Sequence, residues 1–202
     1  YGKTMIIFTS DNGGANYIEL EDINKPFRGW KISFFEGGIR VPFIVSWPDE
    51  ISPGLISKSA VHHFDIFPTI VSAAKTTTSN KKELDGVNLL PYIKKENSEE
   101  PHETLFWRSG NHQSVLHKKW KYIVSKKENK SWLFDTSVDP LEKNNLIESH
   151  PKEAQKIEEL LVQFNSEQKE PLFPSAFEAP IMIDKYDGQA YEEGDEYIYW
   201  SN

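Results

Sequence analysis

The segment SDNGG, residues 10–14, directly follows a short apolar run at residues 5–8. Asp11 and Asn12 offer side-chain oxygens, which are the ligands that Ca²⁺ and Mg²⁺ prefer. In open α/β sheets, ligands bind beyond the carboxyl ends of the strands, where these oxygens would lie. The same residue types are also common in Asx turns that close a strand, and spacing alone favours such a turn.

A basic stretch among glycines and aromatic residues, residues 27–42 (FRGWKISFFEGGIRVP), is the second candidate site. It carries Arg28, Lys31 and Arg40 in a chain whose net charge is −8. Ammonium and guanidinium groups in such a loop suit an oxyanion, for example sulfate or phosphate. The alternative is a solvated loop in which Arg40 pairs with Glu36, and composition alone favours that alternative.

A pair of histidines, His62 and His63, lies at the start of a predicted helix. One imidazole could face a site, although a single histidine is more often structural. We expect Asp65 to cap the helix or to hold a neighbouring base, because a carboxylate is favourable at a helix N-terminus. His112 would reach a substrate only if its hairpin overhangs the pocket.

The elements that must position these residues change in kind along the chain. The apolar run at residues 4–9 is typical of a strand buried on both faces of a parallel sheet, with neighbours on both sides. Because that run begins almost at once, we expect the chain to be the C-terminal part of a larger protein. Apolar residues recur at helical spacing over residues 64–71, where Pro68 fits the first turn.

The second half has the pattern of a small antiparallel sheet. Residues 76–102 are polar and predict a surface connection, whereas residues 103–135 hold four short aromatic and β-branched runs separated by turns. Residues 152–168 then carry an amphipathic helical stripe. The acidic tail from residue 171 is interleaved with tyrosines, so we expect it to pack along a surface. The whole pattern predicts a mixed α/β protein with a small second subdomain.

Composition excludes several classes of protein. Apolar residues make up 38% of the 202 residues and aromatic residues 13%, which is enough for a core. The acidic balance argues against binding of nucleic acid, and no apolar run approaches the ~18 residues of a membrane-spanning helix. The absence of cysteine excludes disulfides, thiolate zinc sites and a cysteine nucleophile within these residues.

Six segments, in the right order, give the chain a family resemblance. They are TSDNGG, FRGWKISFFEGGIRVPFIVSWP, HHFDIFPTIVSAA, LDGVNLLPYI, WKYIV and LFDTSVDPLEKNNL. Together they resemble the C-terminal part of a type I, formylglycine-dependent sulfatase of the alkaline-phosphatase superfamily. The stretch K-x-x-x-x-E-G-G-x-R-x-P is the most specific of them.

The resemblance implies a fold and a division of the chain. The fold is the alkaline-phosphatase-like α/β fold of sulfatases: the last part of a large mixed or parallel sheet, then a small C-terminal antiparallel sheet packed with one helix. Residues 1–100 would belong to the catalytic domain, residues 101–170 would form the small sheet with its helix, and residues 171–202 would be the tail. The expected partner is the N-terminal part of the same protein.

The resemblance also implies roles for single residues. Asp11 and Asn12 match late Ca²⁺ ligands, which residues upstream of this chain complete. Lys31 matches the lysine that contacts the sulfate group and the catalytic side chain. His63 and Arg28 are candidates for substrate binding, and Arg28 and Arg40 are also open to a structural role. By family analogy the protein is exported: periplasmic, secreted or lysosomal.

One departure from the family is large. Its formylglycine nucleophile arises in a C/S-x-P-x-R motif, which these residues lack, so the nucleophile is expected upstream and this chain alone is expected to be inactive. The leading hypothesis is a sulfuric-ester hydrolase acting on a sulfated glycan or an aryl sulfate. The alternatives are a phosphoesterase or phosphonate hydrolase of the same superfamily, and a non-catalytic fragment that binds glycan or assembles with its N-terminal partner.

Overall fold

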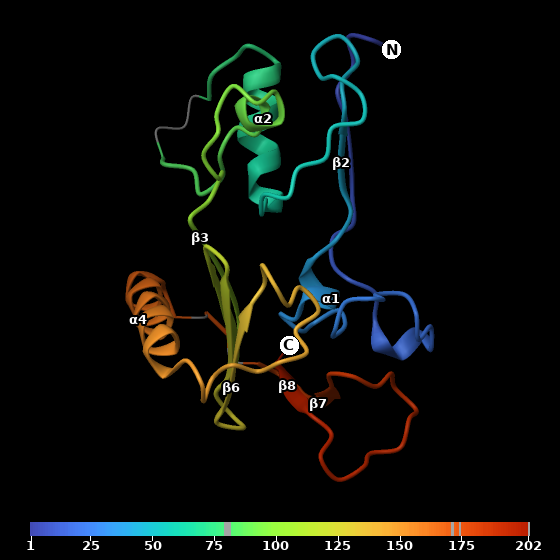
Figure 1. Cartoon of the computed structure of the whole chain (residues 1–202), viewed down its shortest axis with the longest axis vertical. Coiled ribbons are helices and arrows are strands. Elements are labelled where there is room, and N and C mark those ends of the chain that lie inside the picture. Colours follow the sequence, from blue (N-terminus) through green and yellow to red (C-terminus); the bar gives the residue numbers. More distant parts are fainter. Residues whose placement is uncertain (79–81, 171, 174, 202) are drawn as a thin grey trace. The chain divides into compact units, whose positions relative to one another are not determined.

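A computed structural model describes residues 1–78, 82–170, 172–173 and 175–201 of the chain (Figure 1). The chain divides into two compact units. The first comprises residues 1–9 and 42–103, and the second comprises residues 10–41 and 104–202. Within the described ranges, no helix is both long and apolar enough to cross a membrane.

The first unit contains a two-stranded sheet. β1 (Ile6–Thr9) pairs antiparallel with β2 (Phe43–Ser46), and Phe8 lies opposite Ile44. The expectation of a parallel neighbour is therefore wrong for this pair of strands, whereas burial of β1 on both faces in a larger protein stays a prediction. An apolar run predicts a strand but does not fix the direction of its neighbour. Ile6, Phe8 and Ile44 share one face, which the described residues leave 45%, 61% and 57% exposed.

The other face of this ribbon lies beside α2 (Ile66–Ala73), which follows a 3₁₀ turn, η2 (His63–Asp65). Pro68 occupies the first turn of α2, as expected, because its missing N–H costs nothing there. The predicted surface connection includes α3 (Leu90–Ile93), which buries Leu89 and Leu90. Residues 79–81 of that connection lie outside the described residues.

The second unit contains the predicted antiparallel meander, in the order β3-β4-β5-β6. The strands are β3 (Thr104–Ser109), β4 (His112–His117), β5 (Trp120–Ser125) and β6 (Lys130–Asp135). Tyr122 lies opposite Val115 and Leu133 in the register, while Ile123 lies opposite Trp132. Side chains alternate between the faces of a strand, so these two sets point to opposite sides of the sheet.

Each face of the sheet has its own core. On one face, α4 (Pro151–Glu167) packs through Ala154, Ile157 and Leu161, which confirms the predicted amphipathic helix (Figure 1). On the other face, Phe35 joins Ile123, Trp132 and Phe134. The sheet is therefore covered on both sides, and the loop that contains Phe35 is anchored to it.

The tail is more ordered than the sequence indicated. β7 (Glu178–Met182) and β8 (Tyr197–Ser201) pair antiparallel as a hairpin. Ile183 and Ile198 are buried in the same core as Phe35. The short helix η1 (Asn16–Ile18) and the turn α1 (Glu36–Ile39) complete the second unit.

The α4 interface gives a direct test of the core. Leu161→Ala should lower the free energy of unfolding by roughly 2–5 kcal/mol, because it removes buried methylene contacts and leaves a cavity. The neighbouring Val162 is 63% exposed, so Val162→Ala should change it by less than about 0.5 kcal/mol. Urea unfolding of both variants measures the difference, and equal losses would contradict the packing described.

Candidate functional site

The SDNGG turn and the KISFFEGG loop are held together by backbone hydrogen bonds. Gly13 N donates to Gly38 O at 2.9 Å, and Lys31 N donates to Gly14 O at 2.9 Å. Gly37 N donates to Arg28 O at 2.6 Å, which closes the loop on itself. The two segments that the sequence singled out as separate candidates therefore form one structure.

Asn24 fastens this structure from the intervening polar loop. Its side-chain oxygen accepts a hydrogen bond from Gly14 N at 2.7 Å, and its amide nitrogen donates to Gly14 O at 2.9 Å and to Gly29 O at 3.1 Å. All polar atoms of the amide are thus used to hold two glycines. This role of Asn24 could not be predicted from the sequence, because asparagine is common in polar loops.

The glycines allow a backbone approach that no other residue permits. A Cβ atom at Gly13 would lie 1.8 Å from Gly37 O. One at Gly38 would lie 2.1 Å from Ser33 O, and one at Gly37 would lie 2.3 Å from Gly29 O. These neighbours are backbone atoms, so they cannot rotate away. The glycines expected to permit a tight turn are therefore required by contact between two backbones.

Beside Lys31 the backbone is strained. Ile32 has φ +87°, a conformation that β-branched residues rarely adopt. The turn around it is fixed by Ser33, whose N–H and hydroxyl both donate to Trp30 O, at 3.0 and 2.8 Å. Strained backbone of this kind persists only where its surroundings hold it, and it is concentrated at functional sites.

Two charged side chains on this rigid frame have no partner within the described residues. Asp11 is exposed, and neither a hydrogen bond nor an ion pair engages its carboxylate or the Lys31 ammonium. Asn12 donates its side-chain N–H to Gly13 O at 2.9 Å, which leaves its side-chain oxygen to accept or to ligate. Asp11, Asn12 and Lys31 are therefore available to a ligand.

The donor set suits a hard cation, but it is small. Ca²⁺ takes six to eight oxygen ligands. Across the described residues, no group of three or more His, Cys, Asp or Glu side chains comes together in a way that could hold a metal. The side-chain oxygens of Asp11 and Asn12 thus suit Ca²⁺, but two residues supply only part of the ligands that the ion needs.

His63 lies in the first unit, at the end of β1. Its Nε2 is 3.2 Å from the Thr9 hydroxyl oxygen. The adjacent Asp65 is buried, and its carboxylate accepts hydrogen bonds from His62 N at 2.7 Å and Val87 N at 2.9 Å. His102 Nε2 lies 2.8 Å from the same carboxylate. Asp65 therefore both caps the helix start and holds a neighbouring base, as the sequence predicted.

Arg28 has a structural environment in the second unit. Its guanidinium donates to both carboxylate oxygens of Asp184 at 2.7 Å and to Glu196, and it lies over the Phe35 ring. This geometry favours the structural role left open for Arg28. Contact with substrate stays a prediction, and it would require the two tail carboxylates to move.

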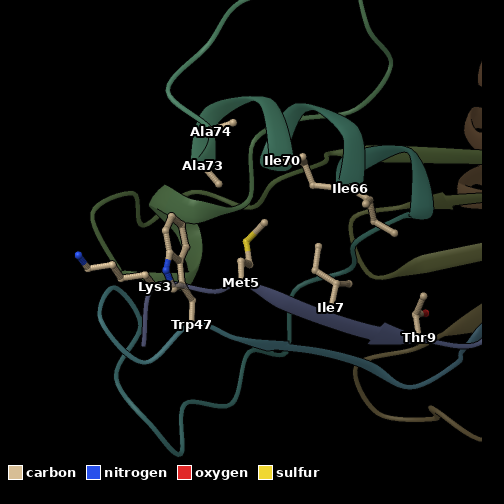
Figure 2. A pocket seen from close by; sticks show the side chains of 9 residues that line it. All are labelled: Lys3, Met5, Ile7, Thr9, Trp47, Ile66, Ile70, Ala73 and Ala74. Atoms are coloured by element: carbon tan, nitrogen blue, oxygen red, sulfur yellow. The ribbon is translucent and has the colours of Figure 1, made fainter. Parts of the chain in front are cut away.

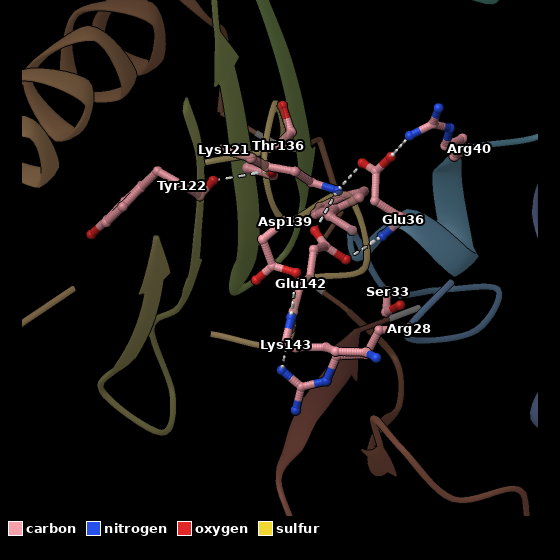
Figure 3. Close-up of polar contacts among 12 residues, drawn as sticks. Arg28, Ser33, Glu36, Arg40, Lys121, Tyr122, Thr136, Asp139, Glu142 and Lys143 are labelled. Atoms are coloured by element: carbon pink, nitrogen blue, oxygen red, sulfur yellow. Dashed lines mark hydrogen bonds and ion pairs between the residues drawn. The ribbon is translucent and has the colours of Figure 1, made fainter. Parts of the chain in front are cut away.

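A buried ion triad, Lys121 with Glu36 and Glu142, lies next to the loop (Figure 3). Lys121 Nζ is 2.6 Å from Glu36 Oε1 and 2.8 Å from Glu142 Oε1. Glu36 also pairs with Arg40 at 3.1 Å, which confirms the pairing considered from the sequence. The sequence analysis missed Lys121 and Glu142, although each lies in a segment that carried the family resemblance.

The protonation of the triad follows from burial and charge. Burial lowers the pKa of Lys121, but the carboxylates of Glu36 and Glu142 outweigh it and raise that pKa above its usual value. Burial raises the pKa of Glu36, yet Lys121 and Arg40 bring it below its usual value. For Glu142, burial and the nearby charge of Glu36 leave the pKa raised in spite of Lys121.

His112 also ties the loop to the sheet. Phe34 N donates to His112 Nε2 at 3.1 Å, and the two rings stack at 4.7 Å. Burial, the largest effect, lowers the pKa of His112 to about 4. This environment favours a structural role for His112 over contact with a substrate, because the ring is buried and its Nε2 accepts from the loop.

An apolar groove of ≈ 520 Å³ lies between β1 and α2 in the first unit (Figure 2). Apolar side chains line most positions of the groove, among them those of Met5, Ile7 and Ile70, and Lys3 is its one charged residue among those described. The groove lacks the carboxylates and paired bases that a sulfate or phosphate ester site needs. We therefore place the candidate site at the SDNGG turn instead.

Two neighbouring glycines provide a matched test of the backbone contact. Gly13→Ala should lower the melting temperature markedly and displace the loop, because the new methyl group meets backbone atoms. For Gly14→Ala the nearest atoms belong to the side chain of Ile23, which is 44% exposed, and not to backbone, so its effect should be smaller. Thermal melts of both variants compare the two sites. A larger loss for Gly14→Ala would contradict the geometry.

The buried histidine gives the fold a pH dependence. The folded-state pKa of His112 is about 4, below the usual 6.5, so the unfolded chain takes up the proton first as pH falls. The contribution of His112 to stability is thus present above pH 6.5 and is lost between 6.5 and 4, by roughly 2–3 kcal/mol. Urea unfolding at pH 7.0 and 4.5 should show a smaller loss for His112→Gln than for the wild type. Parallel losses would show that His112 does not titrate this way.

Comparison with known proteins shows which family the chain matches. Residues 29–170 match the family described as "N-sulphoglucosamine sulphohydrolase, C-terminal". Steryl-sulfatase of Mus musculus is 34% identical over 110 residues, which are 52% of this chain and 18% of that protein. N-acetylgalactosamine-6-O-sulfatase of Bacteroides thetaiotaomicron is 28% identical over 183 residues, 79% of this chain and 36% of that protein.

The fold has solved counterparts as well. Ps i-CgsB, in complex with k-i-k-neocarrahexaose, superposes with a TM-score of 0.73 at 25% identity, over 86% of this chain and 39% of that one. The chain thus spans from about a fifth to two-fifths of the length of these proteins. Family match, relatives and fold agree: this chain belongs to the sulfatase family, in which it corresponds to the C-terminal part of the alkaline-phosphatase-like fold.

Proposed function

We propose that the protein containing this chain is a sulfuric-ester hydrolase that removes sulfate from a sulfated carbohydrate. One observation carries the proposal. The backbone of the SDNGG turn and of the KISFFEGG loop is held by hydrogen bonds, whereas the side chains of Asp11 and Lys31 have no partners among the described residues. A rigid frame with free charged groups is what binding of an anion requires. Family membership and the activities named for the relatives support the same reaction.

Within that reaction, Asp11 and Asn12 would contribute oxygen ligands to a Ca²⁺ ion whose other ligands lie outside these residues. Such an ion, when bound, stabilises negative charge at a sulfuryl oxygen. Lys31 would place its ammonium against the same oxygens. A protein of net charge −8 needs a local positive region to hold an anionic ester, and Lys31 supplies part of it.

The remaining residues take supporting roles in the proposal. His63 would face the substrate from the end of β1, and Arg28 would contribute to substrate binding only after leaving its tail carboxylates. The formylglycine that supplies the nucleophile would lie on an N-terminal part of the same protein. Residues 1–100 would then complete the catalytic domain, with residues 101–170 as the small subdomain and 171–202 as the tail.

Two of the three similar proteins reported above support a glycan substrate. The N-acetylgalactosamine-6-O-sulfatase carries a sugar in its name, and Ps i-CgsB was solved with a neocarrahexaose. Enzymes that act on polymeric glycans must meet them outside the cytoplasm, so we propose an exported protein. An aryl sulfate would serve as a small reporter substrate for the same chemistry.

Lys31 provides the test of this function. In the protein that contains these residues, Lys31→Ala should lower kcat/KM for a sulfate ester by roughly 10²–10³, the usual loss for one electrostatic stabiliser of a transition state. Lys31→Arg should restore little of it, because a planar fork does not replace a compact ammonium. Steady-state kinetics beside a thermal melt measure both effects, and the melting temperature should barely change.

Lys25→Ala is the matched control. Lys25 lies in the same loop region, is exposed, and pairs only with Asp22 nearby, so activity should stay within about twofold of wild type. Activity of Lys31→Ala within threefold of wild type would show that the loop is scaffold. Hydrolysis of a phosphonate ester in preference to the sulfate ester would replace the proposed substrate class with that of the superfamily alternative.

A further inference from the structure

The ion triad of Lys121, Glu36 and Glu142 is not used by the proposed chemistry, yet it contacts the loop that carries Lys31. The Lys121 side chain is 1% exposed and that of Glu142 is 0% exposed. Replacement of a buried ion pair by apolar residues is often neutral or stabilising, because desolvation offsets the Coulomb attraction. Stability alone therefore gives no reason for two carboxylates and an ammonium at this place.

Glu142 makes two contacts of different kinds with its two oxygens. One oxygen lies beside the Lys121 ammonium, and the other accepts the Glu36 backbone N–H at 2.6 Å (Figure 3). Glu36 is the first residue of α1, so this hydrogen bond holds the start of the EGG turn. The ammonium lies 2.8 Å from the first oxygen, close enough to favour the orientation in which the second oxygen accepts the Glu36 N–H.

The segment that presents Glu142 is itself built to fix its position. Asp139 accepts hydrogen bonds from Lys143 N at 3.2 Å and Asn144 N at 2.8 Å. The Asn145 side chain accepts from Leu133 N at 3.0 Å, which ties the segment to β6. Glu142 adopts φ +55°, a left-handed conformation that costs energy for any residue with a Cβ. The late D-P-L-E-K-N-N-L motif thus holds one carboxylate in one place.

From α1 the connection continues to the site through backbone atoms. Gly38, within α1, accepts the Gly13 N–H, and Gly13 follows Asn12 directly. Phe34 N, bound by His112, holds the other end of the same loop. Every step from the triad to the SDNGG turn is therefore a hydrogen bond of 2.6–2.9 Å or a peptide linkage.

We propose that the buried triad is a positioning device, in which Lys121 orients Glu142 so that Glu142 fixes the EGG turn and, through Gly38, the SDNGG turn. Glu142 and Lys121 are thus positioning residues for Lys31, Asp11 and Asn12. The functional meaning of that position rests on the proposed sulfatase activity, whereas the mechanical connection does not. The two are tested by separate measurements on the same variants.

The first measurement is amide hydrogen exchange of the chain. Glu142→Met removes the acceptor and leaves Lys121 paired with Glu36, so the buried charges still balance. It should speed exchange of the Gly13 and Lys31 amides by roughly tenfold relative to the Leu161 amide of α4, because a local fixing bond is lost. Unchanged relative exchange would overturn the proposal.

A double variant separates the hydrogen bond from the charges. In Lys121→Met with Glu142→Gln, the amide oxygen can still accept the Glu36 N–H, while Glu36 keeps its pair with Arg40. Relative exchange at Gly13 and Lys31 should then be faster than in wild type but slower than in Glu142→Met, because the acceptor remains while the ammonium that orients it is gone; exchange equal to wild type would contradict the role of Lys121. Glu142→Gln alone should lie between the two, since one amide oxygen cannot serve both donors, and it replaces Glu142→Met if that variant does not fold. A double variant as fast as Glu142→Met would contradict the role of the Glu36 hydrogen bond.

The second measurement is kinetic, in the protein that contains this chain. Glu142→Met should lower kcat for a sulfate ester by roughly tenfold with little change in KM, as expected when a catalytic group is misplaced. Lys119→Met is the control: it removes a lysine–carboxylate pair of the same 2.6 Å length beside β5, where the lysine is 53% exposed. If amide exchange is faster in Glu142→Met but the wild-type protein hydrolyses no sulfate ester, the proposed function is refuted and the positioning role of the triad is kept. Equal kinetic losses in both variants would refute a positional effect on catalysis.

Discussion

A lysine ammonium that no water reaches has to be neutralised where it lies, and in this chain that requirement organises the second unit. Lys121 lies opposite Phe134 in the register, on the face of the sheet where Ile123, Trp132 and Phe134 pack with Phe35. Its two carboxylates come from segments more than a hundred residues apart, Glu36 and Glu142. If both carboxylates withdrew, the buried ammonium would be left uncompensated, which costs several kcal/mol. The pairing therefore helps to fix a loop and a turn against the sheet, beside the hydrogen bond from Phe34 N to His112.

Close contact between backbone segments fixes the remaining geometry of the candidate site. Gly13, Gly37 and Gly38 lie so close to opposing carbonyl groups that a methyl group would not fit. The geometry around Lys31 depends on main-chain hydrogen bonds, so the charged side chains there are not needed to hold it and are available to a ligand. Rigid backbone with free side chains is the arrangement by which proteins preorganise charge for binding. The strain at Ile32 is consistent with it, because a closed network of bonds can hold a conformation that an open loop would relax.

The sequence predicted the helices and strands better than it predicted the segments against which they pack. The meander, the α4 helix and the Asp65 cap follow from local patterns, since alternation, helical spacing and capping chemistry act between near neighbours. The direction in which β1 pairs was wrong because it depends on a strand that lies far along the chain. The tail hairpin was missed because its many acids mask two buried isoleucines.

The candidate site shows the same division. Asp11, Asn12 and Lys31 were predicted by residue type together with a family resemblance, and their roles stay predictions. Arg28 was left open between substrate binding and a structural role, because an arginine in a glycine-rich loop gives no sign of acids more than 150 positions away. Lys121 and Glu142 could not be paired from sequence, because pairing of charges over such distances requires the fold.

The burial of Lys121 has a consequence for amine chemistry. Acylating reagents attack a lysine only when its nitrogen is both accessible and deprotonated. Lys121 meets neither condition, since its side chain is 1% exposed and the neighbouring carboxylates raise its pKa. Most lysines on the surface should therefore react in the native protein while Lys121 stays unmodified. Acylation of Lys121 would therefore require the loop to separate from the sheet, so the extent of its acylation would measure how often that opening occurs.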